Sequence, residues 1–189
     1  MTTALPLDVQ TKVASEASET FADAYYTALQ AARNTLSSFY SAPETTSDGK
    51  KYPVISWNGN KYDSGAAFQD AFIEQTPNYS YFEVQSLDAQ VLNPLPPLPP
   101  KDEDEPAADG AEAGAAKKGG GKKPAQKEVE ELVGSILVLV NGFVRLHEKK
   151  EGPQRGFSET FVLVPNKDYS KKDGTRRWVV QNQNFRYIV

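Results

Sequence analysis

The chain has 189 residues, a 39% hydrophobic content and a formal net charge of −4, which fit one ordinary domain with its own core. It contains no cysteine and a single histidine, His147, which excludes disulfides, thiolate catalysis and cysteine-ligated zinc and leaves little scope for other metals. We expect no cofactor, and the negative charge disfavours a surface built throughout to bind phosphate backbones. Residues 1–10 lack an apolar leader, and no run of 18 apolar residues follows, so a soluble intracellular protein is expected.

The first predicted element is a long amphipathic helix over residues 8–40. Apolar or small side chains recur at every third or fourth position from Val9 to Phe39, and Asp8 is the expected N-cap. At about 1.5 Å per residue such a helix would extend roughly 50 Å, which exceeds the width of a small domain. We therefore expect a bend or a frayed end.

A β-hairpin and a second helix are predicted next. Residues 53–63 are strand-like around Asn58-Gly59, a pair that supplies the positive φ angles of a tight primed turn. Ser64 is the expected N-cap of a short helix that runs to Gln75 and is stopped by Pro77.

Four longer strands complete the predicted fold as an antiparallel meander over residues 79–92, 135–146, 156–165 and 176–188. In the first strand the inward-facing parity changes near Gln85 and Ser86, which predicts a β-bulge.

The segment 93–128 interrupts this pattern between the first two of those strands. It holds seven of the 13 prolines, five of the 13 glycines and no aromatic residue, so it cannot form a core. Neither flanking half can bury its own apolar face. We therefore expect a single domain over residues 1–189, with 93–128 as a flexible insertion.

Both faces of the predicted sheet are apolar. Ile136, Val138 and Val140 alternate with Leu137 and Leu139, whereas a sheet with one wet face alternates apolar and polar residues. Two helices can cover only one side. The other face is therefore expected to be a permanent interface with a partner; a third layer from the insertion or the N-terminal arm is the alternative.

The order of these elements resembles the nuclear transport factor 2-like family. This family has an α+β fold in which a long and a short helix pack in the concave face of a curved antiparallel sheet. More specifically, four motifs are similar to the small subunit of the mRNA export receptor heterodimer: Ala24-Tyr25-Tyr26, Trp57-Asn58-Gly59-Asn60, Gln154-Arg155-Gly156-Phe157 and Phe185-Arg186-Tyr187.

The resemblance implies a non-catalytic carrier subunit that pairs with the large export subunit through its sheet face. It also implies binding to phenylalanine-glycine nucleoporins and shuttling between nucleus, nuclear pore and cytoplasm. An arginine near the C-terminus pairs with an aspartate of the large subunit in this family, and Arg186 matches it. The predicted interface residues are Arg186, Phe185, Tyr187, Val138, Val140, Phe161, Trp178 and Val180.

A basic run in the insertion is a candidate RNA contact. Lys117, Lys118, Lys122 and Lys123 could contact mRNA or, in fungi, large ribosomal subunits, which the resemblance implies as cargo. The alternative is a solvated flexible loop, because acidic residues lie close by and no aromatic side chain is available for stacking.

Two other functions of the same fold stay open: a homodimeric carrier of the GTPase Ran, and an enzyme working in the cavity between helices and sheet. The acid and base candidates for an enzyme are Asp88, Glu83, Tyr25, Tyr26 and His147. Asp88 has the outward parity, His147 lies in a charged turn, and the tyrosines are expected in the core and at its rim. No catalytic group is predicted.

Overall fold

The computed structural model describes residues 6–92, 134–146, 152–170 and 172–188. In chain order the elements are α1 (Leu7–Ala31), the 3₁₀ helix η1 (Arg33–Phe39), β1 (Glu44–Thr45), β2 (Lys51–Tyr52), β3 (Val54–Trp57), β4 (Asn60–Tyr62), α2 (Gly65–Gln75), β5 (Tyr81–Val91), β6 (Ile136–Arg145), β7 (Arg155–Pro165) and β8 (Trp178–Ile188). The predicted insertion 93–128 with its four lysines, and His147, lie outside the described residues. No helix within the described ranges is long and apolar enough to cross a membrane.

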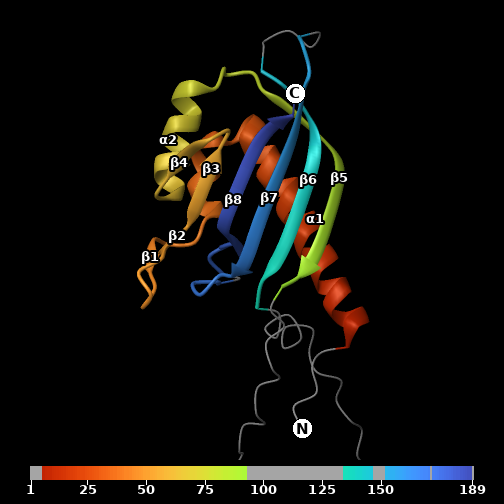
Figure 1. Cartoon of the computed structure of the whole chain (residues 1–189), viewed down its shortest axis with the longest axis vertical. Coiled ribbons are helices and arrows are strands. Elements are labelled where there is room, and N and C mark those ends of the chain that lie inside the picture. The colour runs from red at the N-terminus through yellow and green to blue at the C-terminus, as the bar shows by residue number, and fades with distance from the viewer. Residues whose placement is uncertain (1–5, 93–133, 147–151, 171, 189) are drawn as a thin grey trace, which may run out of the picture.

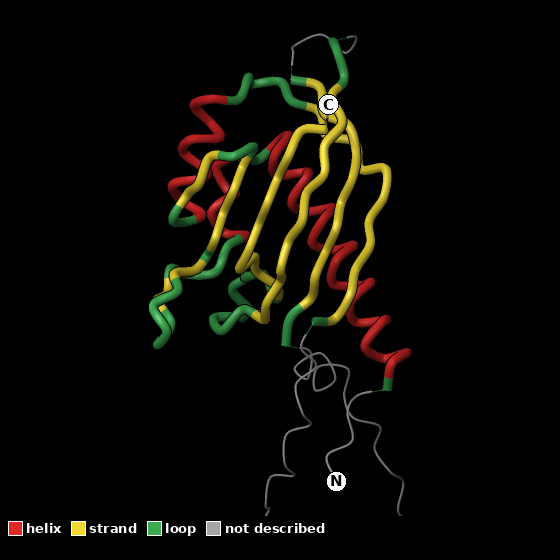
Figure 2. The backbone as a smooth tube through the Cα atoms, in the orientation of Figure 1, coloured by secondary structure: helices red, strands yellow, loops and turns green. Residues whose placement is uncertain are grey.

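Six strands form the main sheet, in the order β4-β3-β8-β7-β6-β5. The predicted meander β5 to β8 is confirmed and is antiparallel throughout. The sheet as a whole is mixed, because β3 pairs with β8 in parallel. Both helices lie on one side of it, with α1 crossing behind the long strands and α2 beside the β3–β4 hairpin (Figures 1 and 2). We call that side of the sheet the inner face and the opposite side the outer face.

The predicted bulge in β5 is present. The pairing of β5 with β6 shifts between Val84 and Ser86, so Gln85 has no partner in the register. Phe82 and Leu87 therefore both face the helices, although they are five positions apart and would lie on opposite faces of a regular strand. A second shift, which was not predicted, lies in β8 between Val180 and Asn182.

Local backbone chemistry explains the hairpin and the second helix as predicted. Asn58 and Gly59 have φ angles of 47° and 94°, as a primed two-residue turn requires. The Ser64 hydroxyl accepts a hydrogen bond of 3.1 Å from the backbone N–H of Ala67, which satisfies a free donor of the first turn of α2.

The first helix bends, as its predicted length requires. The α-helix ends at Ala31, Ala32 leaves helical geometry with φ −141° and ψ 49°, and the chain continues as η1. The predicted N-cap is wrong, because Pro6 occupies that position and no side chain caps the helix. Asp8 lies instead in the first turn, where its charge still interacts favourably with the helix dipole.

Arg33 joins η1 to the segment between α2 and β5. Its guanidinium donates hydrogen bonds to the carbonyls of Leu29, Thr76 and Pro77 and to the Ser80 hydroxyl, at 2.6–3.1 Å.

Replacing Arg33 with methionine should lower the free energy of unfolding by about 2–4 kcal/mol, because these acceptors lose a charged donor. Urea titration measures the change. Arg33→Lys, which keeps the charge without the planar fork, should recover only part of it; an unchanged midpoint for Arg33→Met would contradict this role.

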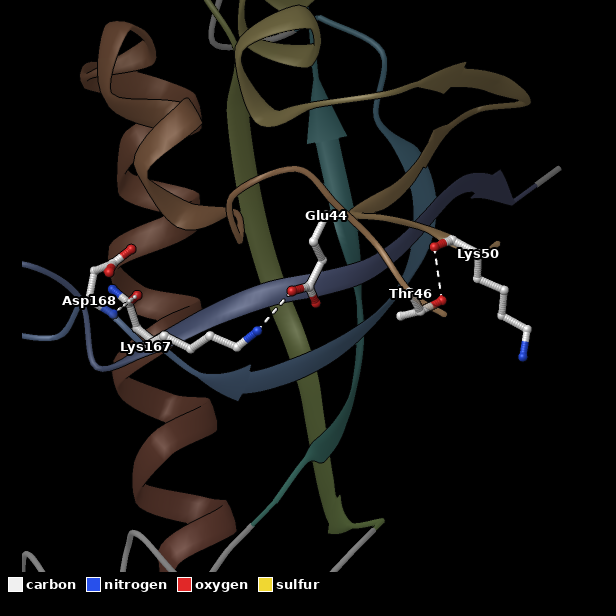
Figure 3. Close-up of polar contacts among 6 residues, drawn as sticks. Glu44, Thr46, Lys50, Lys167 and Asp168 are labelled. Atoms are coloured by element: carbon white, nitrogen blue, oxygen red, sulfur yellow. Dashed lines mark hydrogen bonds and ion pairs between the residues drawn. The ribbon is translucent and has the colours of Figure 1, made fainter. Parts of the chain in front are cut away.

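The β1–β2 hairpin is joined to the loop after β7 by a surface ion pair. Lys167 Nζ lies 2.8 Å from Glu44 Oε2 (Figure 3). The lysine side chain is well exposed and the glutamate side chain is partly exposed. Within the hairpin, the Thr46 hydroxyl donates to the backbone carbonyl of Lys50 at 3.0 Å (Figure 3). Because solvent screens the ion pair, it orients the hairpin more than it stabilises the fold.

Candidate functional site

Most of the predicted interface residues lie on the inner face of the sheet. Six of them are at most 8% exposed and belong to the hydrophobic core: Val138, Val140, Phe161, Trp178, Val180 and Phe185. Tyr187 is half-buried and packs against the same core. The prediction that these residues form the partner interface is therefore wrong, because they lie on the face of the sheet that the helices cover. Alternate residues of a strand point to opposite faces, and these side chains point toward the helices.

Arg186 is the predicted interface residue that does lie on the outer face. It is exposed and pairs with Ser158 of β7 in the strand register. Its Nη1 atom lies 3.4 Å from the position that a Cβ would occupy on Gly59. The β3–β4 turn therefore passes directly beside the guanidinium, and the glycine leaves room for it.

The outer face carries its own apolar side chains, which we call the outer strip: Leu137, Leu139, Phe143, Val162, Val164 and Ile188. Leu139, Phe143 and Ile188 are 38%, 42% and 53% exposed. Within the described part of the chain no element covers this face, which is turned toward the viewer in Figure 1. Polar residues such as Asn141 and Thr160 lie among the apolar ones, a mixture typical of protein interfaces.

A hydrogen-bonded cluster of five polar side chains lies within the core. Tyr26 donates to Glu159 Oε2 at 2.6 Å, and Gln183 Nε2 donates to Glu159 Oε1 at 2.5 Å and to the Tyr25 hydroxyl at 2.7 Å. Tyr40 donates to Gln183 Oε1 at 2.5 Å, and its oxygen lies 3.3 Å from that of Tyr25. We call these five residues the Glu159 cluster.

The hydrogen atoms of the cluster can all be assigned when Glu159 is ionised. Tyr25 is left to donate to Tyr40, and each of the five available hydrogens then has its own acceptor. Burial acts in the opposite direction and raises the pKa of Glu159 to about 7, although the hydrogen bonds from Tyr26 and Gln183 lower it. Burial also raises the pKa of each of the three tyrosines well above its usual value.

A carboxyl group beside tyrosines is an acid-base arrangement that the sequence analysis missed. The signal was present, because Glu159 has the same parity as Phe157 and Phe161 and must face inward with them. All five side chains of the cluster are 0–6% exposed, so a substrate cannot reach the carboxyl group in this conformation. Of the predicted acid-base candidates, Asp88 is exposed on the outer face as expected, and Tyr26 is buried rather than at the rim.

The chain has the nuclear transport factor 2-like fold, which belongs to the α+β class. No family model and no curated protein sequence matches it. The chain is similar in fold to a structure of Mtr2, with a TM-score of 0.59 and 14% identity over 93% of this chain and 99% of that one. A chain from a Sac3N peptide complex with Mex67:Mtr2 gives a TM-score of 0.61 and 16% identity, over 93% and 99% of the two chains.

A protein of a different class shares the same fold. It is a putative dehydratase of the NTF2-like family from Streptomyces avermitilis, with a TM-score of 0.55 and 11% identity over 92% of this chain and 95% of that chain. Fold alone is therefore compatible with both a transport protein and an enzyme.

Proposed function

We propose that the chain is the small, non-catalytic subunit of a heterodimeric mRNA export receptor. Its outer face packs against the similarly folded domain of the large subunit and stabilises that domain. The pair carries mRNA, and in fungi large ribosomal subunits, through nuclear pores by way of phenylalanine-glycine nucleoporins, and shuttles between nucleus and cytoplasm. The lysines of the insertion are candidate contacts for this cargo.

The outer strip is the observation that carries this proposal. Its apolar side chains lie on three long neighbouring strands, β6, β7 and β8, and none of the described elements lies over this face of the sheet. Exposed apolar surface of this kind usually marks an interaction site. The similarity in fold to Mtr2, and to a chain of a Mex67:Mtr2 complex, supports a second subunit of similar fold as the occupant.

The proposal predicts that Phe143→Glu abolishes assembly with the large subunit. The substitution places a charge within the outer strip, beside Ile188, where assembly would remove it from water without a partner. Co-expression with the large subunit of an export receptor, followed by a pull-down, measures the effect. Ile73→Glu is the matched control, because Ile73 is 43% exposed but lies on α2, and it should leave assembly intact.

Two results would contradict the proposed function. The first is equal recovery of the complex with Phe143→Glu and with the wild type. The second is a stable homodimer of the purified chain in light scattering, which would favour the homodimeric carrier of Ran.

Arg186 supplies a separate test of the same interface. If it pairs with a carboxylate of the large subunit, Arg186→Ala should weaken association by about 2–5 kcal/mol, because the partner charge is then buried alone. Titration calorimetry on the heterodimer measures this change. An unchanged dissociation constant would place Arg186 outside the interface.

The Glu159 cluster favours a second candidate, an enzyme that uses the interior of the fold. Turnover of a carbonyl or hydroxyl substrate of cavity size, abolished by Glu159→Gln, would support it. The burial of all five side chains argues against an enzyme. If the chain is instead an export-receptor subunit, Glu159→Gln should assemble with the large subunit as well as the wild type does.

A further inference from the structure

A groove lies between the middle of α1 and the start of β8, on the helix side of the sheet. It encloses about 290 Å³. One wall comes from α1 residues spaced three or four apart, and the other comes from the segment leading into β8: Val13, Glu16, Ala17, Thr20, Phe21, Ala24, Arg176, Arg177 and Trp178. This volume is near the lower end of the range of small-molecule sites, so the groove suits a small organic ligand.

The floor of the groove is apolar and firmly packed. Val13, Ala17, Phe21 and Trp178 are 5–9% exposed, so they belong to the core as well as to the groove. Phe21 is further held by edge-to-face contacts with the rings of neighbouring core residues. A ligand therefore meets a preformed apolar surface and needs little rearrangement of the protein.

Arg176 gives the groove a positive charge without an acidic partner. Its guanidinium carbon lies 3.4 Å from the centre of the Phe39 ring, which holds the group against an aromatic face. Burial lowers the pKa of Arg176, and its Nε atom is buried with no hydrogen-bond partner. Among the described residues, no ion pair includes it.

The opposite wall does not neutralise this charge. Glu16 is the acidic residue in the groove, and it lies 3.7 Å from Lys12 one turn earlier on the helix. Arg177 adds a second cation on the Arg176 side. The groove is therefore apolar along its floor and positive at one end.

We propose that this groove binds a small carboxylic acid with a compact apolar body. The apolar body would lie along Phe21 and Trp178, and the carboxylate would accept hydrogen bonds from the Arg176 guanidinium, whose planar shape suits a carboxylate. The groove is on the opposite side of the sheet from the outer strip, so assembly through the outer strip would leave it open, and the inference does not depend on the proposed function.

Phenylacetate, which has ten non-hydrogen atoms, is a suitable probe, and phenylacetamide is its neutral counterpart of equal size. The chain contains two tryptophans. Trp178 lines the groove, whereas Trp57 is half-buried outside the groove and stacks on Phe185 with a centroid distance of 3.8 Å. In NMR spectra of the full chain, alone or with its large subunit, phenylacetate should shift the indole N–H signal of Trp178 and leave that of Trp57 unchanged.

We expect a dissociation constant on the order of 1 mM for phenylacetate, typical of so small a ligand, and at least tenfold weaker binding of phenylacetamide. Arg176→Gln should remove that preference. Arg155→Gln should keep it, because Arg155 also lies over an aromatic ring, at 5.8 Å from that of Tyr187, but outside the groove. Ala24→Leu should fill the groove and abolish binding of both probes while the fold is retained.

Three results would overturn the assignment. The first is that the Trp178 indole signal shows no saturable shift at a phenylacetate concentration 20 times the expected dissociation constant. The second is equal affinity for phenylacetate and phenylacetamide. The third is that Arg176→Gln still prefers phenylacetate.

Discussion

Raising the pH from 5 to 8 should lower the free energy of unfolding by about 2–3 kcal/mol, and Glu159→Gln should remove most of that dependence. Burial raises the pKa of Glu159 from 4.5 to about 7 in the folded protein. Between these two values the folded protein binds a proton that the unfolded chain releases, so folding becomes less favourable as the pH rises. The loss begins near pH 4.5 and is complete above pH 7, and the whole interval corresponds to about 3 kcal/mol.

The expected effect of Glu159→Gln follows from the same geometry. Glutamine is neutral and of the same size, so it imitates the protonated acid and carries no buried charge at pH 8. Chemical denaturation across this pH range measures the free energy of unfolding of the wild type and of the variant. Asp88→Asn is the control, because Asp88 lies exposed on the outer face, and its profile should follow the wild type. If the free energy of unfolding of the wild type stays constant or rises from pH 5 to 8, the pKa of Glu159 in the folded protein is not raised.

Features fixed by neighbours in the chain could be predicted from the sequence. The Asn58-Gly59 turn and the Ser64 cap depend on the backbone preferences of these residues alone. The bulge at Gln85 could also be predicted, because the parity of the apolar residues changes within a single strand. The bend at Ala32 followed from the length of the helix, although its position did not.

The orientation of the long strands could not be predicted in the same way. Val138 and Leu139 are similarly hydrophobic, so the pattern of β6 does not say which of them faces the helices. That choice depends on packing against α1, which is distant in the sequence. For the same reason the predicted interface residues were placed on the wrong parity. The two walls of the groove at Arg176 come from segments about 150 residues apart, so no local sequence pattern predicts it.

Glycine at position 142 is required by the close approach of two strands opposite the bulge. A Cβ atom there would lie 2.1 Å from the backbone carbonyl oxygen of Glu83 and 2.9 Å from Phe157 Cε1. The first distance is to main-chain atoms of the neighbouring strand, so no side-chain rotation can relieve it. An isolated glycine inside a strand is the sequence signal for such a contact.

Gly142→Ala should therefore lower the free energy of unfolding by at least about 3 kcal/mol, at the upper end of the usual cost of overpacking. To accept the methyl group, β5 must separate from β6 at the bulge, which also loosens Phe82 and the inner core beneath it. Gly156→Ala is the matched control on the next strand. Its Cβ atom would lie 3.4 Å from Ile188 Cβ, an ordinary contact, so a change of less than about 1 kcal/mol is expected. Thermal and urea unfolding of both variants measure the difference, and equal stability of the two would mean that β5 and β6 are further apart at the bulge than the structure places them.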